Sequence, residues 1–92
     1  MKLHEVSRFI KSNPDAIIQL MTLQDCCFTT ICVPVIQLYN DWMSNAPIGL
    51  PENGELVVMC TFYADNKAYP LEDEGFSDGD FESLMRAIEG GI

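Results

Sequence analysis

Carboxylates are the residues whose number and spacing best suit them for chemistry in this 92-residue chain. Fourteen acids stand against five bases, which gives a formal net charge of −9. Residues 1–46 carry a net charge of −1, from four acids and three bases, and residues 47–92 carry −8, from ten acids and two bases. Six of the acids form an acidic run that no base interrupts: Glu72, Asp73, Glu74, Asp78, Asp80 and Glu82.

This acidic run does not have the pattern of a calcium loop or of a catalytic pair. An EF-hand loop that starts at Asp73 would have Gly75 where it needs a ligand and Asp78 where it needs a glycine. A catalytic carboxyl group needs a pKa shifted by burial or by a like-charged neighbour, and these acids lie on an expected loop and helix cap. We therefore expect a non-catalytic chain, in which the acidic run is either a solvated loop or a recognition surface for a basic partner.

Four cysteines and a single histidine are the other candidates for nucleophilic or metal chemistry. Three of the cysteines fall within seven residues, whereas a secreted disulfide scaffold spreads its cysteines along the chain. A zinc site needs paired ligands, but one cysteine stands alone and His4 is expected to be exposed. We therefore predict no metal and no other cofactor, and free thiols that act as small apolar core residues: Cys26, Cys27, Cys32 and Cys60.

The composition predicts a single compact domain over residues 1–92. Apolar residues make up 48% of the chain and charged residues 21%, which is globular composition. No apolar run reaches the roughly 18–20 residues of a membrane span, and the charged start of the chain lacks the apolar stretch of a signal peptide. We therefore expect a cytoplasmic protein that does not bind membranes. The net negative charge also disfavours direct binding to nucleic acid.

Helical periodicity predicts three helical segments in the first half of the chain. The first covers residues 3–12. Asn13, Pro14 and Asp15 are typical of a helix start, so a second helix is predicted from there to about residue 24. The third is predicted from 34 to 44, and we favour its extension through 26–33, where β-branched residues leave a strand as the alternative.

The second half of the chain predicts a hairpin and a closing helix. Residues 46–54 carry two prolines and two glycines and mark a break. Residues 55–72 are rich in strand formers around a turn, and Pro70 restricts the second strand to a sheet edge. Residues 78–89 are predicted to form the last helix. The fold class is therefore α+β, with three N-terminal helical segments, a short antiparallel β-hairpin and a C-terminal helix.

Aromatic residues divide into expected core and expected surface. Phe28, Tyr39 and Trp42 lie on the apolar stripe of the third helix and are predicted to be core, and Phe81 is predicted to pack inward. Phe76 interrupts the acidic run, and aromatic anchors carry much of the binding energy at protein interfaces. The predicted partner-binding residues are the six acids and this phenylalanine: Glu72, Asp73, Glu74, Phe76, Asp78, Asp80 and Glu82.

In its size, its charge and this carboxylate-rich run, the chain resembles small acidic phage-encoded anti-defence proteins of the anti-CRISPR and anti-restriction type. The resemblance implies a stoichiometric inhibitor in the host cytoplasm. Its carboxylates would stand in for phosphates on the basic surface of a CRISPR effector, restriction enzyme or nuclease, with fast, steered association. Two alternatives remain open: an immunity protein that neutralises a nuclease toxin, and an adaptor or oligomer subunit that uses an apolar helix face.

Overall fold

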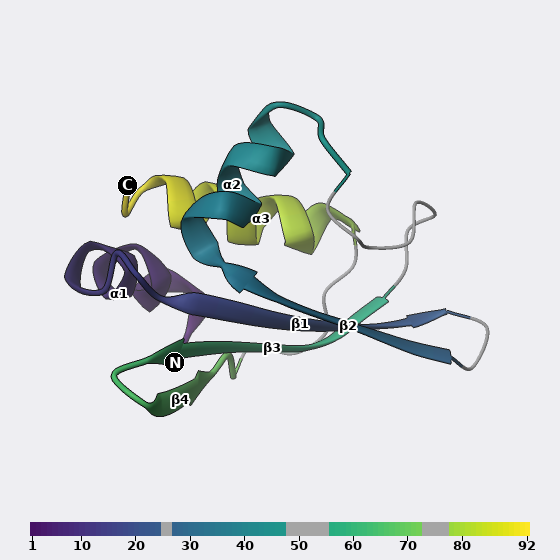
Figure 1. Ribbon diagram of the computed structural model, residues 1–92, viewed down its shortest axis with the longest axis horizontal. Coiled ribbons are helices and arrows are strands. Elements are labelled where there is room, and N and C mark those ends of the chain that lie inside the picture. Colours follow the sequence, from purple (N-terminus) through teal and green to yellow (C-terminus); the bar gives the residue numbers. More distant parts are fainter. Residues whose placement is uncertain (25–26, 48–55, 73–77) are drawn as a thin grey trace.

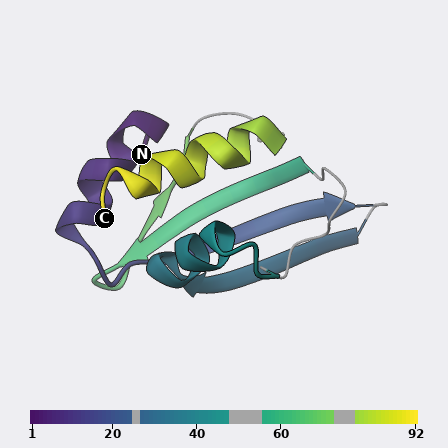
Figure 2. The same cartoon turned by 90° about the horizontal axis from the view of Figure 1, so that it is seen from above.

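A four-stranded antiparallel sheet in the order β2–β1–β3–β4 carries the fold. The computed structural model describes residues 1–24, 27–47, 56–72 and 78–92, and its helices all lie on one side of this sheet (Figures 1 and 2). The predicted α+β class is confirmed. The described elements are η1 (Leu3–Glu5, a 3₁₀ turn), α1 (Val6–Ser12), β1 (Ile17–Gln24), β2 (Cys27–Pro34), α2 (Val35–Met43), β3 (Leu56–Ala64), β4 (Lys67–Pro70) and α3 (Asp78–Glu89).

The segment after α1 is the strand β1, so the predicted second helix is wrong. Asn13 gives the physical reason, because it ends α1 and does not start a new helix. Its side-chain amide donates to the Phe9 carbonyl oxygen at 3.0 Å, and its backbone N–H donates to the same oxygen at 2.9 Å. The chain then turns, with the Ala16 N–H donating to the Asn13 carbonyl at 3.0 Å, and enters the centre of the sheet.

Residues 27–34 form β2, so the favoured helix is wrong here and the strand alternative is correct. β2 pairs with β1 along its whole length, from Gln24↔Cys27 to Ile17↔Pro34. The β-branched residues of this stretch fit a pleated strand better than a helix. Phe28 is 63% exposed as a result, which corrects its predicted place in the core.

The other predicted elements are confirmed. The first helix and the predicted helix at 34–44 correspond to η1–α1 and α2, and the closing helix is α3. β3 and β4 form the hairpin through Asp65 and Asn66, whose φ angles of 52° and 62° are those of a tight two-residue turn. β4, which ends at Pro70, is an edge strand, as the proline predicted.

The core fills the space between one face of the sheet and the helices. Ile18, Leu20 and Phe62 point into it from the strands and are fully buried. The helices meet them with buried apolar side chains of their own: Val6, Ile10, Val35, Leu38, Leu84, Met85 and Ile88. Tyr39, Trp42 and Phe81 are half-buried against this cluster, with Phe81 packed inward as predicted. None of the described helices is both long and apolar enough to span a membrane.

The end of α3 passes α1 so closely that two glycines separate them. A Cβ on Gly91 would lie 2.5 Å from the Ser7 carbonyl oxygen and 2.7 Å from the Ile10 Cβ. A Cβ on Gly90 would lie 2.7 Å from the Ser7 Oγ, which donates a hydrogen bond to the Ala87 carbonyl. Gly91 therefore faces backbone, which cannot move easily, whereas Gly90 faces the end of one side chain.

This difference predicts the cost of adding a methyl group at each position. We expect Gly91→Ala to lower the free energy of unfolding by about 1–3 kcal/mol, the usual cost of overpacking. Gly90→Ala should cost less, and it should cost least when it is made in the Ser7→Ala variant, which lacks the clashing oxygen. Urea unfolding followed by circular dichroism measures all three. Equal losses for both glycine variants, or rescue of Gly91→Ala by Ser7→Ala, would contradict this packing.

Candidate protein-binding surfaces

The structure places part of the acidic run on the surface. Glu72 follows β4 and Glu82 lies on α3, and their side chains are 58% and 59% exposed. Asp78 and Asp80 belong to the first turn of α3. Asp73, Glu74 and Phe76 lie outside the described residues, so their predicted role stays a prediction.

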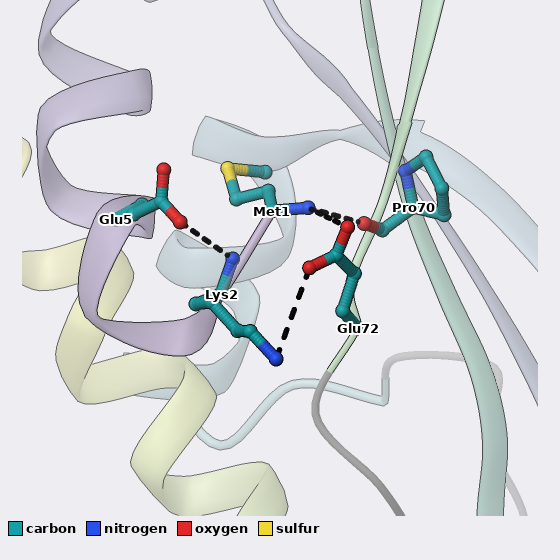
Figure 3. A network of polar contacts seen from close by, with 5 residues as sticks. All are labelled: Met1, Lys2, Glu5, Pro70 and Glu72. Atoms are coloured by element: carbon teal, nitrogen blue, oxygen red, sulfur yellow. Dashed lines mark hydrogen bonds and ion pairs between the residues drawn. The ribbon is translucent and has the colours of Figure 1, made fainter.

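Glu72 is tied to the first residues of the chain (Figure 3). Its carboxylate lies 3.5 Å from the Met1 amino group and 3.8 Å from the Lys2 ammonium. The Met1 amino group also donates to the Pro70 carbonyl at 2.8 Å, and the Glu72 N–H donates to the Met1 carbonyl at 2.8 Å. Met1 therefore runs beside the end of β4, and its amino group and Lys2 offset part of the negative charge at this end of the run.

Arg86 pairs with Glu82 of the run and joins α3 to α2. Its guanidinium lies 3.5 Å from a Glu82 oxygen and 3.3 Å from a Glu89 oxygen, and it stands 5.4 Å above the Trp42 ring centre. Burial, followed by the charge of Glu89 and a hydrogen bond to it, raises the pKa of the Tyr39 hydroxyl, while Arg86 opposes this shift. Exposed pairs of this kind are worth about 0–1 kcal/mol each, so their carboxylates stay available to a partner.

None of the described acidic side chains is buried. These carboxylates therefore present their charge to solvent, where a cationic partner can reach them. Within the described residues, no three His, Cys, Asp or Glu side chains gather in a way that would hold a metal ion. His4 is exposed, as predicted. What this arrangement can do chemically is attract cationic groups.

The described thiols are free, but only one of them is a core residue. Cys60 is 2% exposed and packs in the core, whereas Cys27 and Cys32 are exposed on β2. The predicted core role is therefore correct for Cys60 and wrong for these two. β2 is an edge strand, with Cys32 on its face away from the helices and Cys27 at its first residue. Cys26 lies outside the described residues. Burial raises the pKa of the Cys60 thiol to about 12.

A second candidate surface, which the sequence reasoning missed, is the face of the sheet away from the helices. This open face consists of every second residue of β1 from Ile17 to Leu23, with the residues opposite them on β2 and β3. Phe28 (63%) and Met59 (51%) are its most exposed apolar side chains. Its described part has no charged residue, and the Tyr63 hydroxyl donates across it to the Gln19 Oε1 at 2.7 Å.

A signal for the open face was present in the sequence. Asp25 is the sole charged residue between residues 16 and 40, although that stretch includes polar and exposed positions. When two paired strands carry no charge on either face, one face can pack against the core. The other face is then uncharged as well, although no other element covers it. Because helices were predicted over residues 14–33, this signal was not interpreted as an uncharged face of a sheet.

Comparisons with known proteins add no relative. No family model matches the chain, and no match was found among curated proteins or solved structures. The two surfaces are therefore interpreted from their own chemistry.

The raised pKa of Cys60 predicts a loss of stability at alkaline pH. Below about pH 9 both folded and unfolded chains keep this thiol protonated. Above it, the unfolded chain releases the proton from its ordinary value of 9.0, while the folded chain holds it until about 12. Because the unfolded state is then favoured, the free energy of unfolding should fall by about 1 kcal/mol between about pH 9 and pH 10 from this group.

Cys60→Ala provides the control for this slope. The variant should be less stable at every pH because it loses core packing, but it should lack the part of the alkaline loss that Cys60 causes. Urea unfolding at pH values from about 8 to 10 gives both curves. Parallel curves for the two proteins would show that the thiol is not held protonated by the fold.

Proposed function

We propose that this protein is a non-catalytic binding protein, of the anti-CRISPR or anti-restriction kind, that covers a basic nucleic-acid-binding surface of a larger protein. The observation that carries the proposal is the charge of −8 on residues 47–92, set against −1 on residues 1–46. Its described carboxylates, including Glu72 and Glu82, are on the surface and not in the core. A solvated loop alone does not require so much like charge, which works against a compact fold.

The exposed carboxylates suit a surface that normally holds phosphates. Each of them carries a single negative charge on an exposed side chain. Glu82 and Glu89 lie on α3, and Glu72 follows β4. Charges of this kind accelerate association with a basic surface and favour it over neutral or acidic ones. The partner we propose is a CRISPR effector, a restriction enzyme or a nuclease.

The alternatives differ in the surface they use. An immunity protein for a nuclease toxin would use the same carboxylates on a different basic partner. An adaptor with an apolar helix face would need an exposed stripe on a helix, but Val35 and Leu38 of α2 and Leu84 of α3 pack on the sheet. The burial of these residues favours an interface made by the acids.

Charge reversal in the acidic run tests the proposal. We expect wild-type protein in stoichiometric amounts to stop DNA cleavage by its target within a panel of CRISPR effectors, restriction enzymes and nuclease toxins. Asp73→Lys and Glu74→Lys should each weaken that inhibition several-fold. Association should slow as salt rises, because the Debye length falls from about 10 Å at 0.1 M to about 3 Å at 1 M.

Asp15→Lys is the matched control, because it makes the same charge change at an exposed acid outside the run. It should inhibit nearly as well as the wild type, and the inhibitor and DNA should exclude each other from the target. Equal losses in all three variants would point to net charge and not to the acidic run. If neither the charge reversals nor salt change the inhibition, the acidic run is not the interface.

A further inference from the structure

We propose that the open face of the sheet binds a second copy of this chain, giving a symmetric dimer of two stacked sheets. This inference goes beyond the proposed function, because it involves neither the acidic run nor a basic partner. It rests on the apolar exposure of this face, on the absence of charge from its described part and on its area.

The exposed apolar side chains of the described residues concentrate on this face. Of the six large hydrophobic residues that are most exposed, four belong to it: Ile17, Phe28, Met59 and Tyr63. They come from three adjacent strands, so they form one surface and are not isolated positions. Met21 and Met59 lie opposite each other near its middle, and methionine side chains adapt easily to an apposed surface. A polar row of Gln19, Cys32 and Thr61 lies between the two ends of this face. Exposed apolar side chains gathered on one face are typical of sites of protein association.

The distribution of charge selects a second copy as the occupant. Two chains of net charge −9 repel each other in most orientations. In Figure 1 the helices lie on the other side of the sheet from the open face, and α3 carries Glu82 and Glu89 there. With layers about 10 Å apart, stacked sheets would hold the two α3 helices about 30 Å from each other, well beyond the Debye length of about 8 Å. Stacking of the open faces therefore keeps Glu82 and Glu89 of one copy far from those of the other.

A basic partner is a poorer match for this face. Such a partner would be drawn to the carboxylates, and the described part of the open face offers it no opposite charge. A second copy instead offers an identical uncharged surface, and the two-fold symmetry of a dimer needs a patch that complements itself. Stacked sheets of this kind pack with their strands about 30° apart.

The area of the face is large enough for a small dimer interface. Three strands of eight or nine residues and the short β4 cover roughly 400 Å² at ordinary strand spacings. Two such faces with projecting side chains bury on the order of 1,000 Å², which is the lower limit for a specific interface. We therefore expect a weak dimer whose population depends on concentration.

Met59→Glu tests the interface directly, because it places a charge at an exposed position in the middle of the face. Gln37→Glu is the matched control, since it adds the same charge at an exposed position of α2 on the opposite side. Sedimentation equilibrium should give a dissociation constant at least about tenfold higher for Met59→Glu and nearly unchanged for Gln37→Glu. The wild-type dimer should hold or tighten as salt rises, because salt screens the repulsion between copies. This is opposite to the salt dependence expected for a basic partner, so the two proposals fail separately.

Two native thiols give a second measurement that needs no variant. Cys32 lies on the open face opposite Gln19, whereas Cys27 is five residues away and points to the other side of β2. Both are exposed in the single chain. As protein concentration rises, alkylation of Cys32 should slow while that of Cys27 stays constant, with tandem mass spectrometry separating the labelled sites.

Four results would overturn the proposal. One is a wild-type protein that remains a monomer at about 1 mM. Another is a dimer that Met59→Glu and Gln37→Glu affect equally. The third is protection of Cys27 and Cys32 to the same extent as concentration rises, and the fourth is a Cys32 rate that does not change at all. If Met59→Glu fails to fold by circular dichroism, the Cys32 and Cys27 rates of the wild type decide.

Discussion

The covering of the sheet on one side is the constraint on which the rest of this structure depends. The three α-helices of the described residues contain 7, 9 and 12 residues, enough to bury one face of a four-stranded sheet. β1 lies in the middle, and its alternate side chains Ile18 and Leu20 supply the centre of the core. Every other residue of the same strand is then committed to the face that no described helix covers. The apolar surface on that face follows directly from the pleat of the strand.

This constraint also separates two kinds of surface. The helical side and the chain segments that lead to it carry carboxylates, which act at a distance and weaken with salt. The open face acts by contact, through apolar area released from water. A partner that recognises one of these surfaces gains little from the other, so the chain has room for two independent associations. Glu82 is an example of the first kind and lies in the helical layer, and Phe28 is an example of the second and lies in the sheet.

The elements that the sequence predicts well are those whose signals are local. α2 and α3 have one apolar stripe each, and the β3–β4 hairpin has its turn residues in place. The sequence predicts a helix where β1 lies, because the apolar residues of this strand occupy both of its faces. Ile17, Ile18, Leu20 and Met21 therefore fit a helical stripe equally well. Asn13 strengthened the error, since its side chain can cap the helix before it as well as the one after it.

The two surfaces differ in the same way. The acidic run is visible in the sequence because its members are neighbours along the chain. The sequence shows that residues 16–40 are nearly uncharged, but it does not show which residues share the open face. Strand pairing brings together residues as distant as Gln19 and Tyr63, which are joined by a hydrogen bond. To predict a surface that three strands form together, one must know the order of the strands in the sheet. Predicting one of these strands as a helix makes that order impossible to derive.

The two edges of the sheet differ in how well they are protected against pairing with strands of other molecules. β4 is four residues long, carries Lys67 and Pro70, and continues into a segment bonded to Met1. β2 offers eight residues at the opposite edge, none of them charged. Such an edge recruits strands from other chains and can seed fibrils, and side chains of its own normally prevent this. We expect the repulsion between molecules of net charge −9 to oppose such pairing here. Acidification toward the isoelectric point near 4.1 would remove that repulsion, so we expect β2 to become a template for aggregation there.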